Sequence, residues 1–194
     1  MSLRRRHRPL WVVPSYTITS EDESAIWKAI RREYEAFTGP GPFIVTIDGR
    51  SGSGKSRLAE RLLDRARADV SPKSELFHLE DLYPGWEGLA AGVDHYAAML
   101  NQLLTGHDAA WNAWDWTRGQ AEEAQRTVSA SVPLLIAEGV GASAPGHPEV
   151  SGHFGLWLHV ETPVRRFRAL RRDGDLYRPY WALWADQEAK LFDS

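Results

Sequence analysis

Cysteine is absent from this chain of 194 residues, and methionine occurs only twice. The lack of cysteine excludes disulfide bonds and thiolate zinc sites, so only histidine and carboxylate side chains could hold a metal. The histidines show no pairing at metal-ligand spacing, and we expect them to be ordinary polar residues. A chain without cysteine fits a reducing compartment, in agreement with the cytoplasmic location that we expect because the sequence lacks a membrane span and a signal peptide.

Long apolar runs are also missing. None reaches the roughly 18 residues that a membrane span requires, and the N-terminus lacks the apolar core of a signal peptide. The formal net charge of −3 argues against a dedicated nucleic-acid-binding protein. We therefore expect one domain over residues 1–194 with no membrane or nucleic-acid partner, and a solvated basic tail from Arg4 to Arg8.

A glycine-rich motif is the strongest feature that is present. Residues 49–56 read Gly-Arg-Ser-Gly-Ser-Gly-Lys-Ser and match the phosphate-binding P-loop, G-x-x-x-x-G-K-S. Glycines let the backbone turn its N–H groups toward a polyphosphate, Lys55 supplies a charge for the β- and γ-phosphates, and the Ser56 hydroxyl can bind Mg²⁺. A turn that only caps a helix is the alternative. The residues expected to contact the nucleotide are Gly49, Ser51, Gly52, Ser53, Gly54, Lys55, Ser56 and Arg57.

Apolar runs and helical patterns alternate along the chain. Runs at 43–47, 75–79, 133–138 and 156–160 predict strands, and helices are predicted at 20–37, 55–66, 94–104, 119–129, 162–172 and 179–192. Ser20 and Glu23 predict a capping box for the first helix, and residues 111–116 predict a tryptophan-rich turn. The pattern predicts an α/β protein with a three-layer P-loop nucleoside triphosphate hydrolase fold, a mainly parallel sheet and a ligand at the carboxyl ends of the strands.

Carboxylates follow two of the predicted strands. Glu80 and Asp81 come directly after the strand 75–79, and Glu138 ends the strand 133–138. In a parallel sheet these acids lie near the P-loop, where one can accept the proton of a hydroxyl and another can hold the water shell of Mg²⁺. Glu138 and Ser56 are the expected metal residues. A helix cap at Asp81 and a solvated strand end at Glu138 are the alternatives.

In four places, taken in order, the sequence resembles the uridine kinase-like group of P-loop small-molecule kinases. Residues 48–56 look like the P-loop of that group, 80–83 are similar to its Asp-Asp-Phe-Tyr motif, and 135–139 are similar to its apolar run ending in Glu-Gly. Residues 168–173 resemble its lid, in which an Arg-Asp pair closes a basic helix. The resemblance implies a catalytic role for Lys55 and Glu138 and transfer of the γ-phosphoryl group of Mg-ATP to a small hydroxylated metabolite.

The resemblance leaves the catalytic base open. In the family the first acid of the Asp-Asp-Phe-Tyr motif is the catalytic base. Here Glu80 stands at this position, and Asp81 stands at the second. Both are candidates, and Asp81 is preferred because its shorter side chain would hold its geometry with less loss of entropy. The resemblance also predicts a further strand and an adenine-flanking loop after the last helix, where the sequence stops at Ser194.

The arginines of the helix 162–172 gather on one face. Arg165, Arg168 and Arg172 recur at helical spacing, and a lid over residues 165–178 would bring them to a transferring phosphoryl group. Arg168 and Arg172 are the expected catalytic pair. A basic, solvated helix is the alternative.

The segment 83–131 separates two predicted strands and is expected to bind the phosphoryl acceptor. It holds Tyr83, Asp115, Trp116 and Arg118, in which Asp115 could bind an acceptor hydroxyl, Arg118 an anionic substituent, and an aromatic ring the face of the acceptor. The chain contains nine tryptophans, and these are as readily explained by core packing or by a homodimer contact.

Two functions follow from the sequence. The first is an ATP- and Mg²⁺-dependent kinase of a nucleoside-like or other small metabolite. The second is a P-loop ATP-binding switch or ATPase that has no metabolite acceptor, which the lack of a recognisable nucleoside-binding motif between residues 83 and 131 favours. The sequence has no Asn-Lys-x-Asp string, which lowers the case for a GTPase.

Overall fold

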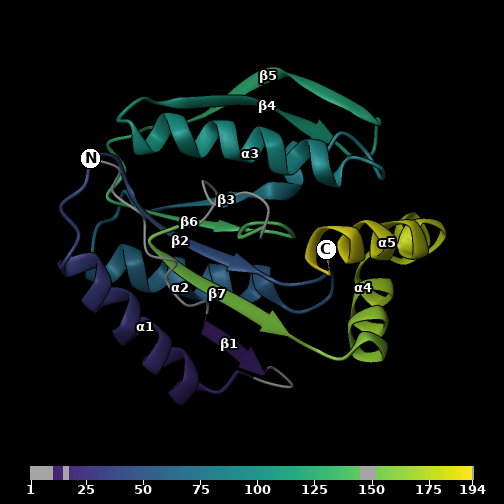
Figure 1. Cartoon of the computed structure of the whole chain (residues 1–194), viewed down its shortest axis with the longest axis horizontal. Helices are drawn as coiled ribbons and strands as arrows, with labels where there is room; N and C mark the ends of the chain where they lie inside the picture. The colour runs from purple at the N-terminus through teal and green to yellow at the C-terminus, as the bar shows by residue number, and fades with distance from the viewer. Residues whose placement is uncertain (1–10, 15–17, 145–151, 194) are drawn as a thin grey trace.

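A five-stranded parallel sheet forms the centre of the computed structural model, which describes residues 11–14, 18–144 and 152–193 (Figure 1). The predicted basic tail from Arg4 to Arg8 lies outside the described residues. The sheet has the order β1 (Trp11–Pro14), β7 (Phe154–His159), β2 (Phe43–Asp48), β6 (Leu134–Glu138) and β3 (Glu75–His78). The helices are α1 (Ser20–Glu35), α2 (Lys55–Asp69), α3 (Leu89–Leu104), α4 (Thr162–Tyr177) and α5 (Trp181–Phe192), with short 3₁₀ helices at Leu79–Leu82 and Arg178–Tyr180.

The sheet lies between two helical layers. Leu135 and Ala137 of β6 belong to an apolar cluster that includes residues of α3 and α5, whereas Leu134 and Ile136 belong to a second cluster with α1 and α2. Figure 1 shows α3 on one side of the sheet and α1 and α2 on the other. Because successive side chains of a strand point to opposite faces, a strand covered on both sides is a continuous apolar run. The predicted three-layer fold with a parallel sheet is confirmed.

The edge strand β1 was not predicted. It pairs in parallel with β7, with Trp11 opposite Leu156, and thereby extends the sheet beyond the strand that precedes α4. From the resemblance to the uridine kinase-like group, we expected a further strand after the last helix instead. In the structure the fifth strand comes from the beginning of the chain, and a run of four residues that ends in Pro14 is too short to stand out by its periodicity.

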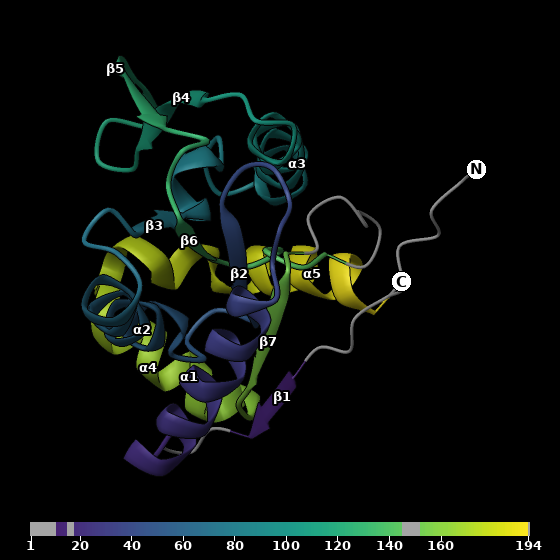
Figure 2. The ribbon, with the colours of Figure 1, turned by 90° about the vertical axis from the view of Figure 1, so that its left-hand side faces the viewer.

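A two-stranded antiparallel ribbon corrects two predictions. Residues 111–116 were predicted as a turn and 119–129 as a helix, but they belong to β4 (Ala109–Asp115) and β5 (Gln120–Val128). The ribbon lies on the α3 side of the sheet, far from α1 (Figure 2). β5 is rich in Glu, Gln and Ala, which favour a helix when they are exposed, and pairing with β4 overrides this local preference.

Two helix ends also differ from the expectation. Thr19, rather than Ser20, caps α1, because its hydroxyl accepts from the Asp22 N–H at 3.1 Å while the Asp22 carboxylate accepts from the Thr19 N–H at 2.9 Å. Helix α4 continues past the predicted end at residue 172 to Tyr177, with a kink at Gly174, where φ is +55°. Among the described residues no helix is long and apolar enough to cross a bilayer.

Candidate active site

The P-loop connects β2 to α2 and packs against the start of α4. Gly52 has a φ of +82°, and a Cβ atom there would lie 2.2 Å from the carbonyl oxygen of Arg165, so only glycine fits. Gly54 has a φ of +98° and stands at the N-cap of α2, where it supplies no side-chain cap. The first N–H groups of α2 are therefore available to a bound anion, which the helix dipole also favours.

Lys55 is almost fully buried beneath the loop. Its Nζ donates to the carbonyl oxygen of Gly49 at 2.7 Å and to that of Arg50 at 3.4 Å. Burial lowers the pKa of Lys55, and the charges of Glu138 and Asp48 partly offset this effect. The ammonium group is thus held inside the curve of the loop, where a phosphate would meet it.

Glu138 joins three elements at the carboxyl end of the sheet. One of its oxygens accepts from the Ser56 hydroxyl at 3.1 Å and lies 2.6 Å from Nδ1 of His78, at the end of β3. Burial acts to raise the pKa of Glu138, but the hydrogen bond from His78 and the charge of Lys55 outweigh it and lower the pKa. Its hydrogen bond to Glu138 raises the pKa of His78. His78 was expected to be an ordinary polar residue, and the structure instead places it against a site carboxylate.

A buried ion pair between Arg165 and Glu188 holds the P-loop in place. Glu188 of α5 accepts from the Ser51 N–H at 2.6 Å, and Arg165 of α4 donates to the Ser51 carbonyl oxygen at 2.9 Å. The Arg165 guanidinium lies 3.5 Å from the Glu188 carboxylate, and these side chains are 5% and 1% exposed. The peptide groups of Ser51 are thus held between two helices. We expected Arg165 to lie on the phosphate-binding face of α4. Its guanidinium instead contacts Ser51 and Glu188.

Removing Glu188 is expected to destabilise the protein strongly. A Glu188→Ala variant leaves Arg165 buried without its counterion, and a buried charge left in this way costs about 3–5 kcal/mol. Asp186→Ala on the same helix is the matched control, since Asp186 is 60% exposed and pairs with Lys190 at the surface, so its loss should cost about 1 kcal/mol or less. Urea unfolding of both variants measures the difference. Equal stability of the two variants would contradict the structural role of the pair.

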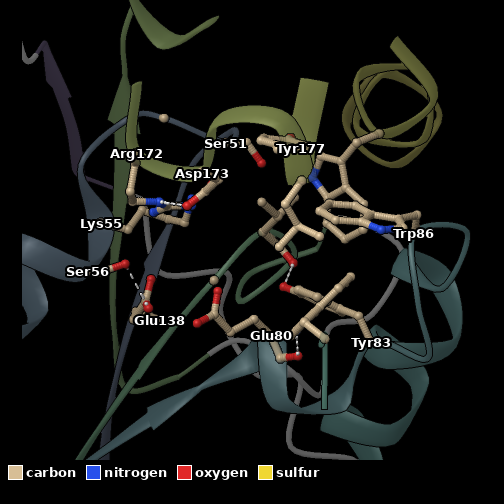
Figure 3. A pocket seen from close by; sticks show the side chains of 16 residues that line it. Ser51, Lys55, Ser56, Glu80, Tyr83, Trp86, Glu138, Arg172, Asp173 and Tyr177 are labelled. Carbon is tan, nitrogen blue, oxygen red and sulfur yellow. Dashed lines mark hydrogen bonds and ion pairs between the residues drawn. The ribbon is translucent and has the colours of Figure 1, made fainter. Parts of the chain in front are cut away.

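Two cavities meet at the P-loop. The first, of about 260 Å³, is rich in aromatic side chains, and we call it the aromatic cavity (Figure 3). The second, of about 990 Å³, lies between the P-loop and α4, and we call it the arginine cavity. Both include Gly52, Lys55, Ser56 and Arg172. The aromatic cavity is also lined by Ser51, Glu80, Tyr83, Trp86, Trp116, Glu138, Gly139, Val140, Asp173, Leu176, Tyr177 and Trp184. The arginine cavity is also lined by Ile18, Ser53, Gly54, Arg57, Arg61, Val164, Phe167, Arg168, Ala169 and Arg171.

The structure separates the two candidate bases. Glu80 lines the aromatic cavity with Glu138, whereas the Asp81 carboxylate accepts from Nη1 of Arg126 in β5 at 2.7 Å and does not line the cavity. Desolvation and the nearby charge of Glu138 raise the pKa of Glu80. The geometry therefore favours Glu80, and not the Asp81 preferred from the sequence, as the carboxylate that meets an acceptor.

The four residues expected to bind the acceptor also divide. Tyr83 and Trp116 line the aromatic cavity. The Asp115 carboxylate instead accepts from the N–H groups of Thr117 and Arg118, at 2.9 and 3.0 Å, and so closes the turn between β4 and β5. Arg118 is exposed at this turn and lines neither cavity.

The arginines of α4 face the arginine cavity through Arg168 and Arg172. Arg172 donates to both carboxylate oxygens of Asp173 at 2.7 Å, a bidentate contact that holds its guanidinium at the junction of the two cavities. Arg57, at the start of α2, lines the same cavity from the other side. Together with Lys55, Arg61 and Arg171, these arginines line a space large enough for a nucleotide.

Comparison with known proteins gives a likeness at the level of structure. No protein-family model and no curated protein matches this sequence. The structure of a possible uridine kinase from Bacillus stearothermophilus matches with a TM-score of 0.59 and 19% identity, over 88% of this chain and 93% of that one. A protein provisionally named a fructose transport system kinase, from Silicibacter sp. TM1040, matches with a TM-score of 0.63 and 19% identity, over 87% of this chain and 89% of that one. The chain has the P-loop fold of these two structures. The resemblance found in the sequence is confirmed for the fold.

The residues at the junction fit Mg-ATP. The uncapped N-terminus of α2, the buried Lys55 and the glycine at position 52 are the features that a polyphosphate requires of a P-loop kinase fold. No three histidine or carboxylate side chains gather into a metal site by themselves in the part of the chain that the structure describes. Mg²⁺ is usually bound by one or two protein groups together with phosphates, and Ser56 with Glu138 are the groups placed to do this.

Several residues of the site were missed from the sequence. Trp86, Tyr177 and Trp184 line the aromatic cavity, and they come from the loop before α3, the end of α4 and the first turn of α5. They meet because α5 packs against α3 and because Tyr177 stacks on Trp86. The clustering of tryptophan in the sequence was the available signal, and it was assigned to core packing or a homodimer contact.

Proposed function

We propose that the protein is a kinase that transfers the γ-phosphoryl group of ATP to a hydroxyl group of a small metabolite. The observation that supports this is the junction of the two cavities at Gly52, Lys55, Ser56 and Arg172. A nucleotide in the arginine cavity would have its terminal phosphate at this junction, and an acceptor in the aromatic cavity would approach it from the opposite side. This in-line arrangement is what phosphoryl transfer needs.

The side chains at the junction and beside it have different roles in this proposal. Glu80 accepts the proton of the acceptor hydroxyl, for which its raised pKa is suited. Lys55 and Arg172 balance the negative charge that spreads over the transferring phosphoryl group, and Arg168 does so from the side of α4. Ser56 and Glu138 would hold Mg²⁺, which would neutralise part of the charge of the phosphates.

The alternative is an ATP-binding switch or ATPase without an acceptor. Against it stands the aromatic cavity, which would have no ligand, although Glu80 and Glu138 line it together with five aromatic side chains. A switch needs only the arginine cavity and the P-loop.

Transfer of label from γ-labelled ATP distinguishes the two functions. With a pool of hydroxylated metabolites and Mg²⁺, a kinase should release ADP faster than with Mg-ATP alone, and the label should appear on an organic product. A constant rate of ADP release, with all label in inorganic phosphate, would identify an ATPase. The metabolite pool without protein is the control.

A further inference from the structure

The aromatic cavity has two chemically different ends. Figure 3 shows Lys55, Ser56, Glu138 and Arg172 on one side and Tyr83, Trp86 and Tyr177 on the other. The first side is the junction with the arginine cavity. The second is the aromatic end, which we define as Tyr83, Trp86, Trp116, Leu176, Tyr177 and Trp184. An acceptor whose hydroxyl meets Glu80 has the rest of its structure at this end.

The aromatic end is preformed by contacts between rings. Trp86 stacks on Tyr177 with ring centres 5.2 Å apart and planes at 13°, and its ring centre lies 4.7 Å from that of Trp116. Trp184 meets Tyr83 edge-on at 5.2 Å. Rings held by other rings form a rigid apolar wall, which suits a flat or apolar part of a ligand.

The aromatic cavity is lined by one more carboxylate than cations. Its carboxylates are Glu80, Glu138 and Asp173, whereas its only Lys or Arg side chains within the described ranges are Lys55 and Arg172. Both cations lie at the junction, and Arg172 is held by Asp173. No Lys or Arg of the described chain lines the aromatic end, and Arg118, once expected to bind an anionic substituent, is outside the cavity.

Two of the polar hydrogens at the aromatic end are already used in hydrogen bonds to the backbone. Trp116 Nε1 donates to the carbonyl oxygen of Glu80 at 3.3 Å, and the Tyr83 hydroxyl donates to that of Val140 at 2.8 Å. Trp184 Nε1 is buried and has no hydrogen-bond partner among the described residues, so it is an indole N–H here that a neutral hydrogen-bond acceptor of a ligand could use. An anionic group here would lose its water and gain no counterion, a transfer that costs several kcal/mol, whereas a neutral ring or a cation would not meet this penalty.

We propose that the acceptor is an uncharged or positively charged alcohol with a flat or apolar part, and that the aromatic end excludes anionic alcohols. The proposal rests on the proposed kinase function and adds to it the charge class of the substrate. The cavity volume of about 260 Å³ limits the acceptor to a small molecule.

Matched pairs of alcohols that differ by one carboxylate test this proposal. The probes are uridine and orotidine, nicotinamide riboside and nicotinic acid riboside, and pantothenol and pantothenate. Phosphorylation is followed with γ-labelled ATP, and binding is followed by calorimetry in the presence of a non-hydrolysable ATP analogue. We expect the uncharged or cationic member of at least one pair to be preferred by about tenfold or more in kcat/KM and in affinity.

A positive charge placed at the aromatic end should reduce the preference for the uncharged or cationic alcohol. Leu176 lines the cavity and is 53% exposed, so we expect Leu176→Arg to fold. The variant should reduce the difference in kcat/KM and in affinity between the two alcohols of each pair. Leu183→Arg is the matched control, because Leu183 is a 37% exposed leucine of α5 that does not line the cavity. It should leave the preference unchanged.

The outcomes separate this proposal from the kinase function. If the anionic alcohol of a pair is phosphorylated faster, or if both alcohols have the same kcat/KM, the proposed charge class of the acceptor is wrong while the kinase function stands. Charge-selective binding that Leu176→Arg weakens, without any transfer of label, supports the charge class and contradicts the kinase function. Absence of both binding and transfer for every probe overturns the charge class.

Discussion

Replacing Lys55 by alanine is expected to lower phosphoryl transfer by about two to three orders of magnitude and to weaken ATP binding. The Lys55 ammonium is nearly fully buried, lies at the junction of both cavities, and is held by the carbonyl oxygens of Gly49 and Arg50. It is therefore already positioned to stabilise negative charge that develops on a phosphoryl group. Among the described residues, no other lysine lines either cavity. Calorimetric titration with Mg-ATP measures ATP binding, and turnover with an acceptor that the wild-type protein phosphorylates measures the rate of transfer.

Lys73→Ala is the control for Lys55→Ala, because Lys73 is an exposed lysine in the turn before β3. Its removal should leave ATP binding and turnover unchanged. Thermal unfolding of both variants shows whether the loop has lost its structure as well as its charge. Wild-type affinity and turnover in a folded Lys55→Ala variant would contradict the assignment of this loop to phosphate.

Glu80→Gln is expected to lower turnover by about two to four orders of magnitude while ATP affinity changes little. The amide keeps the shape of the side chain and removes its ability to accept a proton. Because desolvation and the nearby Glu138 raise the pKa of Glu80, the wild-type rate should fall with decreasing pH through a value above the usual range of glutamate. The variant should lose this dependence, and a pH profile of kcat/KM with a known acceptor measures it.

Asp81→Asn is the matched comparison. Asp81 pairs with Arg126 outside the aromatic cavity, so the exchange should weaken one contact to β5 and change turnover far less than Glu80→Gln does. The reverse order, with Asp81→Asn as the slower variant, would return the role of base to Asp81. Equal activity of both variants and the wild type would show that neither carboxylate accepts the proton.

The parts of the fold that were predicted correctly are encoded locally. The apolar run of β2, the glycines of the P-loop and the amphipathic start of α2 are neighbours in sequence, so the motif fixed the strand, loop and helix together. The errors lie where distant segments decide. β5 has the composition of an exposed helix, and its pairing with β4 outweighs that preference.

In the candidate site, too, the features that could not be predicted are those that depend on distant segments of the chain. Glu80 and Asp81 are equivalent to a local analysis, and they are distinguished by Arg126, which lies in the strand that was predicted as a helix. Trp86, Tyr177 and Trp184 belong to three different segments of the chain, and the packing of α5 against α3 and of Tyr177 on Trp86 brings them to one cavity. Side-chain contacts of this kind depend on the complete fold and cannot be derived from spacing.

The position of β1 at the edge of the sheet has a consequence for the order of folding. Trp11 lies opposite Leu156, so this pairing closes a loop of about 145 residues, whereas β2 and the start of α2 are neighbours in the chain. Contacts between distant residues form slowly because the entropy of loop closure is lost before the contact stabilises the chain. During synthesis, the strand made first must therefore remain unpaired until β7 has been made, and the nucleotide-binding loop can take shape while the edge of the sheet is still open.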